Sequence, residues 1–567
     1  MLSTQSKRFP YFLAAVLLAG CGGASGDPPA SPPSHRLGAP LQAEAQCPGI
    51  DLVARQNLVY VSDQGSDTGV CGQSAATACK SIAQGIANCN GPSCSVLVRH
   101  GWYATGASIV LRDGVDLNGS CRFGGEPDRK YRSVIAAAPV PGTAALVGHG
   151  INSPTTVSGL VVIGKDESAP GAPSIAMALD ASKGVRLLNV TLAPGRGGNG
   201  AAGVAVNGGP GGNGTVFPNG TGSEDGGFDH SGGFACRAAA PASGGNGGDG
   251  SSPNYSVLGN CFADCDCAPN IPGGHVGARG EDSVPGIDGS GIGGAGGGPG
   301  GNGCGCKRSG SNVPGIGGAG ARGGGGACGA SGGVKDTRLM GQAGFRGLNW
   351  LPATGGTGAP GIGGAGGGGG GPGGVAMMSN HNLLIGFGGG GGGGGGCGGA
   401  GGAGGQQGGA SIALVLADAS MAGIPGQATL APGPGGNGGA GANGGLGGAG
   451  GNGGSLGVGP QGTTDYLFCS VPAPGFGGAG GAGGRGGAGS GGAGGNGGPS
   501  IGIALVGASP APDASSIHPG LPGAGGARGK GARNPPDPAI DPNPCAGADG
   551  EDGVAGGAAA IVKFIRE

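Results

Sequence analysis

Short apolar segments separated by polar turns make up the first third of the chain. Residues 57–62 alternate apolar and polar side chains, as a half-buried strand does, and Ile82 and Ile86 have the spacing of a short amphipathic helix within residues 78–88. The following apolar runs read SVLVRHGWYA, SIVLRDGVDLNGS, SVIAAA, TTVSGLVVIG and VRLLNVTL, with turn residues between them. Because no long helical pattern separates these runs, we predict an all-β fold.

One strand-turn-strand unit occurs three times, at the edges of two long glycine tracts. It begins SIAMALDASKG at Ser174, SIALVLADAS at Ser411 and SIGIALVGAS at Ser500. A last apolar run, AAAIVKFI, starts at Ala558. Copies so distant in sequence support one another only as neighbours in space, so we expect each glycine tract to leave the stack of strands and to return to it.

The non-glycine residues of the second tract recur at every third position. This period fits Ala479, Ala482 and Arg485 in the stretch that begins at Gly477, GGAGGAGGRGGAGSGGAGGNGGPS. After a one-residue slip, the period resumes at Ala493. Three residues per turn is the repeat of the polyproline-II helix, whose backbone groups point outward. Polyglycine-II helices packed in a bundle would pair these backbone groups by hydrogen bonds between neighbouring helices. The alternative is a disordered spacer, because glycine loses the most freedom on folding.

The first segments resemble the start of a pectin-lyase-like right-handed parallel β-helix. The resemblance rests on the opening VYVSDQGSD with the following CKSIAQGIA, and on the runs GVDLNG, SGLVVIG and GVRLLNVTL, and it covers residues 57–192. It implies parallel coils that bury alternate Val, Ile and Leu side chains. The expected fold class is therefore all-β, a right-handed parallel β-helix with long glycine-rich, polyglycine-II-like excursions.

The glycine tracts themselves resemble the PGRS type of glycine-rich repeat, with GGAGGAGG and GGNGG as the shared motifs. The helical PE module that accompanies such tracts in PE-PGRS proteins is not found in this sequence. The predicted organisation has seven parts. These are a lipoprotein signal peptide (1–20), a flexible tether (21–49), β-helix coils (50–194), a glycine-rich excursion (195–410), a further coil (411–432), a second excursion (433–499), and a terminal coil and strand with a Pro/Gly-rich loop (500–567).

Composition supports a collapsed glycine-rich protein and excludes one class of partner. The chain has 157 Gly and 43 Pro in 567 residues, but only 11% of its residues are charged, which is too little for a solvated, self-repelling disordered chain. The 29 basic and 31 acidic residues give a net charge of -2. This balance gives no electrostatic reason to expect a nucleic acid as partner.

The N-terminal residues predict a membrane anchor. Lys7 and Arg8 precede an apolar run over residues 11–18, and the run ends in Leu-Ala-Gly-Cys at Cys21. This tetrapeptide resembles the bacterial lipobox, which implies a diacylglycerol on the Cys21 thiol. No Asp follows Cys21, which favours the outer membrane or cell surface as the location. The alternative is an ordinary cleaved signal followed by an incidental cysteine.

The cysteine pattern indicates an exported, disulfide-bonded protein. There are 17 cysteines, and an even number remains when Cys21 is set aside. Closely spaced cysteines are the candidates for local disulfides, with a metal site as the alternative for the last two pairs, although no His lies near them. The candidate pairs are Cys71 and Cys79, Cys89 and Cys94, Cys265 and Cys267, and Cys304 and Cys306.

The sequence shows no catalytic constellation, cofactor motif or metal-ligand set. A carbohydrate lyase needs clustered carboxylates and a basic residue, and the nearest approach to such a set is Lys165, Asp166, Glu167, Asp180 and Arg186. Two stretches, GGNGGDGSS from residue 244 and GADGEDGVA from residue 547, come close to a calcium-binding nonapeptide, but that motif binds calcium only as a tandem array.

These observations favour a lipid-anchored cell-surface protein with a structural or adhesive role and no enzymatic activity. Its expected partners are the membrane, through Cys21, and extracellular polysaccharide or other surface proteins. Two alternatives remain open. A polysaccharide-binding or polysaccharide-cleaving β-helix protein should have a cleft with converging carboxylates, and an ice-binding protein should have a flat face of regularly spaced small residues.

Overall fold

The computed structural model separates into Met1–Ala43 and Glu44–Glu567. The structure describes the second of these units in part and none of the first. The described residues are 45–48, 57–90, 93–124, 132–137, 140–204, 325, 327–335, 345–346, 348–368, 376–377, 383–384, 390–424, 428–455, 464–466, 469–471, 476–512, 516–536 and 544–564.

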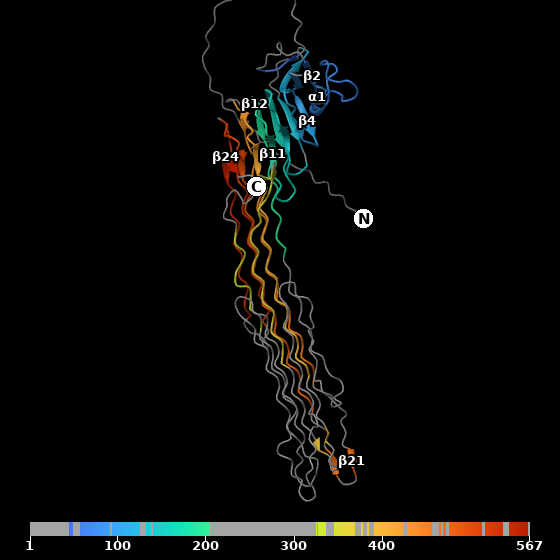
Figure 1. Cartoon of the computed structure of the whole chain (residues 1–567), viewed down its shortest axis with the longest axis vertical. Helices are drawn as coiled ribbons and strands as arrows, with labels where there is room; N and C mark the ends of the chain where they lie inside the picture. The colour runs from blue at the N-terminus through green and yellow to red at the C-terminus, as the bar shows by residue number, and fades with distance from the viewer. Residues whose placement is uncertain are drawn as a thin grey trace, which may run out of the picture. The chain divides into compact units, whose positions relative to one another are not determined.

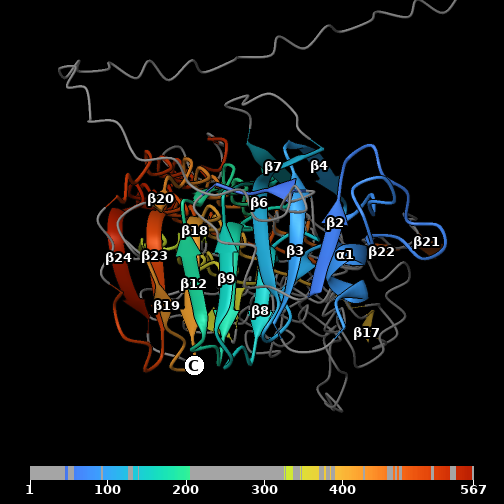
Figure 2. The ribbon, with the colours of Figure 1, turned by 90° about the horizontal axis from the view of Figure 1, so that it is seen from above.

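Three parallel sheets carry most of the strands (Figures 1 and 2). The first sheet contains β2 (Asn57–Val61), β3 (Cys94–Arg99), β6 (Asp116–Phe123), β9 (Thr155–Ser158), β12 (Val185–Leu188) and β19 (Ala422–Gly423), with β1 (Ala45–Gln46) antiparallel to β6. The second contains β4 (Gly101–Thr105), β7 (Ser133–Ala137), β10 (Leu160–Gly164), β13 (Thr191–Ala193) and β20 (Thr429–Leu430). The third contains β5 (Ile109–Val110), β8 (Ala144–His149), β11 (Ser174–Asp180), β18 (Ser411–Ala417), β23 (Ser500–Val506) and β24 (Ala558–Phe564).

The remaining elements among the described residues are short. They are α1 (Ile82–Asn88) and three antiparallel hairpins, β14 (Phe345–Arg346) with β15 (Asn349–Trp350), β16 (Ala376–Met377) with β17 (Leu383–Leu384), and β21 (Thr464–Tyr466) with β22 (Cys469–Val471). The all-β class predicted from the apolar pattern is confirmed. Figure 2 shows the strands of the first sheet side by side from β2 to β12, in their order along the chain.

The chain visits the three sheets in a fixed order. β3, β4 and β5 form one pass through the first, second and third sheets, and β6, β7 and β8 form the next. Each strand then pairs in parallel with the strand one pass later, as β7 does with β10. Strands on successive passes therefore stack on one another, an arrangement compatible with a parallel β-helix.

The repeated unit of the sequence forms adjacent strands of the third sheet. Ser174 pairs with Ser411 and Ser411 with Ser500, so the three copies align residue for residue over hundreds of intervening positions. The last apolar run extends the ladder, with Ser500 opposite Ala558. The prediction that the copies are neighbours in space is confirmed.

All three glycine-rich connections occur at the same point of the pass. Each leaves after the second sheet and re-enters at the third: between β13 and β18, between β20 and β23, and between Ile517 and β24. Ile517 takes the place of a second-sheet strand, because it bridges in parallel to Leu430 of β20. The other connections between sheets remain short, so insertion at this one corner leaves the ladders of all three sheets intact.

The interior between the sheets is filled by alternate aliphatic side chains. Along the third sheet these are Met177 and Leu179, followed on the next pass by Leu414 and Leu416, all of them fully buried. Helix α1 packs Ile82 and Ile86 into the same cluster.

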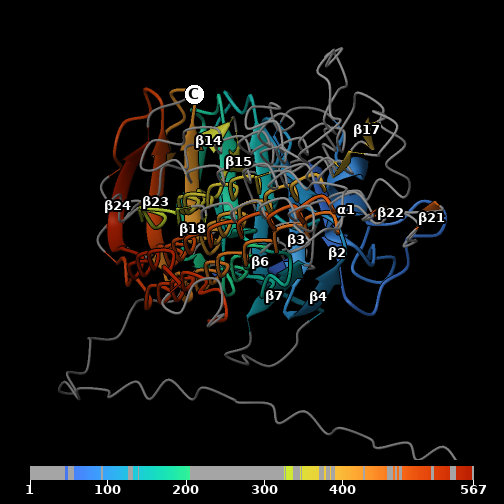
Figure 3. The same ribbon diagram turned by 90° about the horizontal axis from the view of Figure 1, so that it is seen from below.

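The other face of the third sheet is covered by a second apolar layer. Phe345 and Trp350, from the hairpin β14–β15, are buried against it, and Figure 3 shows this hairpin beside β18. The rings of Phe345, Trp350 and Phe564 make mutual edge-to-face contacts with centroids 5.2–5.9 Å apart. A few apolar residues inside a glycine tract therefore cover the outer face of the third sheet.

The glycine segments belong to none of the named helices and strands, and they run side by side (Figure 1). Backbone hydrogen bonds join neighbouring segments at every third residue. Gly480, Gly483 and Gly486, for example, donate to the carbonyls of residues 454, 451 and 448 at 2.8–2.9 Å. A period of three in the hydrogen bonds matches the period of three in the sequence, because successive residues of such a segment face different neighbours.

Candidate functional site

The segment 480–498 lies at the centre of the glycine segments. Every backbone N–H from Gly489 to Gly494 donates to a neighbouring segment, and every C=O from Gly489 to Ala493 accepts from one. These N–H groups donate to carbonyl oxygens of residues 442–445, 356–359 and 548–551. The C=O groups accept from N–H groups of residues 529–532, 402–405 and 333. The central segment thus has six neighbours and satisfies its backbone without a side-chain core.

Close approach of these backbones requires glycine at most positions. A Cβ atom on Gly492 would lie 2.2 Å from the carbonyl oxygen of Ala403, and one on Gly486 would lie 2.0 Å from that of Cys397. Neither backbone oxygen can move aside without breaking its own hydrogen bonds. The tract is therefore glycine-rich because its packing excludes side chains.

The one-residue slip in the sequence coincides with the arrival of a new neighbour. Ala482 and Arg485 are half-buried and lie in one phase of the three-residue repeat. From Gly491 onward, the N–H groups of the residues at these positions of the repeat donate to carbonyl oxygens of residues 548–554. A Cβ on Gly491 would lie 2.1 Å from the carbonyl oxygen of Gly529. Side chains are therefore excluded at these positions, and the non-glycine residues occur instead at the positions of the repeat that include Ala493.

The exposed side chains along residues 437–455 face away from the other glycine segments. Exposed residues recur at every third position along one segment as Asn437, Ala440, Asn443, Leu446, Ala449, Asn452 and Ser455. Asn437 and Asn443 are also used internally, because their Oδ1 atoms accept from the N–H groups of Ala524 and Lys530 at 3.0 and 2.8 Å. The exposed row combines Asn, Ala, Leu and Ser side chains of different sizes.

A pocket of about 400 Å³ lies beside α1, at the first passes of the sheets. Its walls come from the turn after β2, from the start of α1 and from β4. The lining residues are Asp63, Asp67, Lys80, Ser81, Ile82, Ala83, Trp102, Tyr103, Ala104, Thr105 and Ile109. Sequence reasoning did not single out this set, although VYVSDQGSD holds both carboxylates and SVLVRHGWYA holds the tryptophan.

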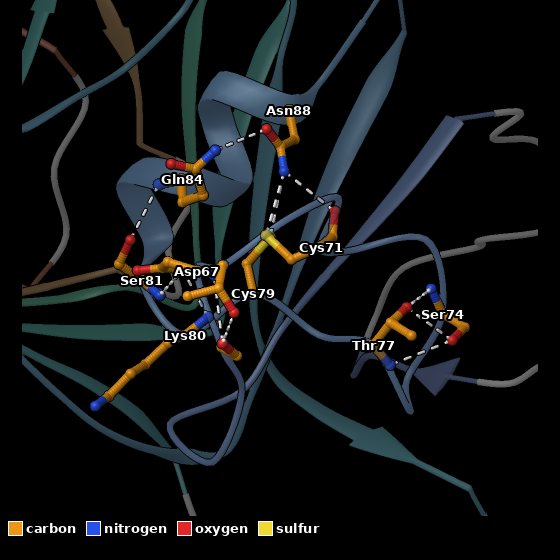
Figure 4. The surroundings of a disulfide bond; sticks show 11 residues. Asp67, Cys71, Ser74, Thr77, Cys79, Lys80, Ser81, Gln84 and Asn88 are labelled. Carbon is orange, nitrogen blue, oxygen red and sulfur yellow. Dashed lines mark hydrogen bonds between the residues drawn. A yellow bond between two sulfur atoms is a disulfide. The ribbon is translucent and has the colours of Figure 1, made fainter.

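Hydrogen bonds fix the wall of the pocket beside α1 (Figure 4). The Asp67 Oδ1 atom accepts from the backbone N–H groups of Lys80 and Ser81 at 2.8 and 3.0 Å, and the Ser81 hydroxyl caps α1 by accepting from the Gln84 N–H. Although burial raises the pKa of the Asp67 carboxyl, hydrogen bonds from Ser81 and Lys80 outweigh it and hold this pKa below its ordinary value. Asp67 therefore remains ionised at neutral pH.

Disulfides hold the same region. The two near pairs of the sequence are bonded, Cys71 to Cys79 and Cys89 to Cys94. The sulfur atoms of Cys71 and Cys79 lie near Asp67, but they are bonded to each other and offer no thiolate for a metal ion.

Two long-range disulfides also occur among the described residues, Cys47–Cys121 at the first sheet and Cys328–Cys545 between glycine segments. Cys397 is disulfide-bonded as well. Spacing gave no signal for Cys47–Cys121 or Cys328–Cys545, because the two cysteines of each pair are 74 and 217 residues apart. The other cysteines proposed from the sequence lie outside the described residues: Cys21, Cys265, Cys267, Cys304 and Cys306.

The charged residues considered for catalysis are engaged separately. Asp166 Oδ1 accepts from the Arg196 N–H at 2.7 Å, and Asp180 pairs with His149 at 3.5 Å. Lys165 is exposed in the connection after β10, and Arg186 is exposed on β12 of a different sheet from Asp180. In the stretch from residue 547, Asp549 and Asp552 accept from the backbone N–H groups of residues 531 and 528. The structure gathers no catalytic set from these residues.

Glu167 is buried at the corner where the glycine tracts depart, and its Oε2 atom has no hydrogen-bond partner. Burial raises the pKa of its carboxyl, against the opposing effect of the Lys165 charge. The folded protein therefore favours the protonated form more than the unfolded chain does. The stability associated with this preference is present below the ordinary pKa of glutamate and is lost as pH rises through the raised value.

We expect Glu167→Gln to remove this loss. The difference in melting temperature between the variant and the wild type should shift in favour of the variant as pH rises from 4 to 8, because the variant has no carboxyl to ionise. Calorimetric melting at several pH values measures this difference, and a difference that is constant with pH contradicts the assignment.

Comparison of the chain with protein-family models, with curated protein sequences and with solved structures gave no match. Within the described residues, no helix has the length and apolar character needed to cross a membrane.

Proposed function

We propose that the protein is a lipid-anchored cell-surface protein with a structural or adhesive role and no enzymatic activity. In this proposal the three sheets form a right-handed parallel β-helix, and the glycine segments form a bundle of polyglycine-II helices. The observation that carries it is the central segment, whose backbone groups from Gly489 to Ala493 are all bonded to six neighbours. Such a bundle supports a rigid scaffold and offers little side-chain chemistry.

The way the bundle joins the sheets supports the same role. Three glycine-rich connections depart at one corner and return to adjacent strands β18, β23 and β24. Each end of the long segments is thereby fixed in a sheet ladder, and Cys328–Cys545 links two segments covalently. Fixed ends and cross-links offset the conformational entropy that glycine loses. This construction suits a protein that displays or spaces surfaces.

The anchor in this proposal is a diacylglycerol on Cys21, at the bacterial outer membrane or cell surface. The tether that follows is shorter than the predicted 21–49, because Ala45 and Gln46 pair with β6 and Cys47 is bonded to Cys121. Partners are extracellular polysaccharide or other surface proteins. The exposed row of Asn, Ala, Leu and Ser side chains lacks the uniformity that the alternative function of ice binding would favour.

Cys21→Ser should move the protein from the membrane fraction to the soluble fraction, because the serine hydroxyl does not accept the diacylglycerol. Incorporation of labelled palmitate should disappear with it. Ser25→Ala, a change in the adjacent tether, should leave both properties as in the wild type. Palmitate labelling that survives in Cys21→Ser would show that the anchor is elsewhere.

A further inference from the structure

We propose that the pocket beside α1 binds a neutral pyranose unit of an extracellular glycan, stacked on the indole of Trp102. This inference rests on the proposed adhesive role and names the ligand class. Trp102 lines the pocket with 57% of its surface exposed, whereas Trp350, the only other tryptophan, is 5% exposed. A large exposed indole in a pocket offers a flat apolar face of the kind that the CH face of a sugar ring covers.

Strand geometry explains why the indole faces outward. Residues alternate across β4, so Tyr103 points into the core and Trp102 points to the other side. Tyr103 is held in place because its hydroxyl donates to the Arg99 carbonyl at 2.8 Å. Burial, together with the nearby charge of Asp63, raises the pKa of the Tyr103 hydroxyl, which therefore stays a neutral donor. The indole is thus presented from a strand with a fixed inner neighbour.

Polar groups beside the indole suit sugar hydroxyls. The Asp63 carboxylate lies against Gly101, where a Cβ would come within 2.9 Å of it, and it makes no hydrogen bond with the described residues. The Asp67 Oδ1 atom accepts from the backbone N–H groups of Lys80 and Ser81, just before α1, which fixes the orientation of its carboxylate. Figure 4 shows the Lys80 side chain extending away from the disulfide. The pocket therefore offers hydrogen-bond acceptors and an ammonium donor around an apolar platform.

Charge selects among sugars. Two carboxylates, Asp63 and Asp67, line the pocket against one ammonium, Lys80, so an acidic glycan would be repelled by the excess negative charge. A neutral sugar binds without this penalty. The disulfide Cys71–Cys79 and the cap of α1 keep the wall rigid, which lowers the cost of binding.

The test uses intrinsic tryptophan fluorescence with a panel of neutral glucose, galactose, mannose and N-acetylglucosamine oligosaccharides, and with oligogalacturonate and tetramethylammonium as charged probes. Trp102 reports on the pocket, and buried Trp350 serves as an internal reference. We expect saturable binding of at least one neutral oligosaccharide, measured in parallel by calorimetry. Trp102→Ala should weaken it at least tenfold, Trp102→Phe less, and Asp63→Asn several-fold, with the melting temperature unchanged.

Val70→Ala, at an exposed apolar side chain that does not line the pocket, is the control and should bind as the wild type does. Three results would overturn the proposal: no neutral sugar bound, binding unchanged in Trp102→Ala, or binding only of oligogalacturonate or tetramethylammonium. None of them bears on the anchor, which the Cys21→Ser fractionation tests by itself.

Discussion

Gly492→Ala should destabilise the protein by about 3 kcal/mol or more, because its methyl group would lie 2.2 Å from the backbone oxygen of Ala403. To relieve this overlap two segments must separate, which breaks several inter-segment hydrogen bonds and leaves buried N–H and C=O groups unpaired. Thermal unfolding followed by calorimetry measures the loss. Amide exchange should locate it, with protection falling first in residues 489–497.

The matched control is the same substitution at Gly106, where a Cβ would have no atom within 4 Å. Gly106→Ala should change the free energy of unfolding by about 0.5 kcal/mol at most. Equal effects at the two positions, or complete exchange of amides 489–497 in the wild type, would mean that the glycine segments are not packed in solution.

Trp350→Ala and Phe345→Ala should each cost about 3–5 kcal/mol of stability, since each removes a buried aromatic ring from the layer over the third sheet. Both rings also contact Phe564 on β24, the edge strand of that sheet, so its pairing should loosen with them. Denaturant unfolding gives the magnitude, and amide exchange in Ala558–Phe564 gives the location.

The second tryptophan supplies the control for this prediction. Trp102→Ala removes a ring of the same size from an exposed position and should leave stability almost unchanged. If Trp350→Ala were as mild as Trp102→Ala, the hairpin β14–β15 would not be a fixed cover of the sheet.

The strands were foreseeable because each depends on a local pattern. The alternation in residues 57–62 yields β2, and the units starting at Ser174, Ser411 and Ser500 yield β11, β18 and β23. Strands that stack in the same register of one sheet meet similar neighbours and need similar sequences, so the repeat also indicated that these strands are neighbours. The hairpin around Phe345 and Trp350 was not foreseen, because two-residue strands carry no detectable period.

The candidate binding site was only partly foreseeable. Asp63 and Asp67 lie in a conspicuous turn, but nothing local brings Trp102 to them. That proximity follows from the stacking of the passes, in which β2 pairs with β3 and β4 follows at once. A tryptophan in the outward phase of an alternating strand was the one signal that could have indicated a surface site.

The period of three in the glycine tracts needed no structure to recognise, since it repeats within a few residues of one segment. The partners of each segment did need the structure. Glycine has no side chain to specify a neighbour, so the six segments around Gly489–Gly494 are chosen by the return points of the chain in the third sheet. The slip before Ala493, unexplained in the sequence, follows from the arrival of residues 548–554 on that face.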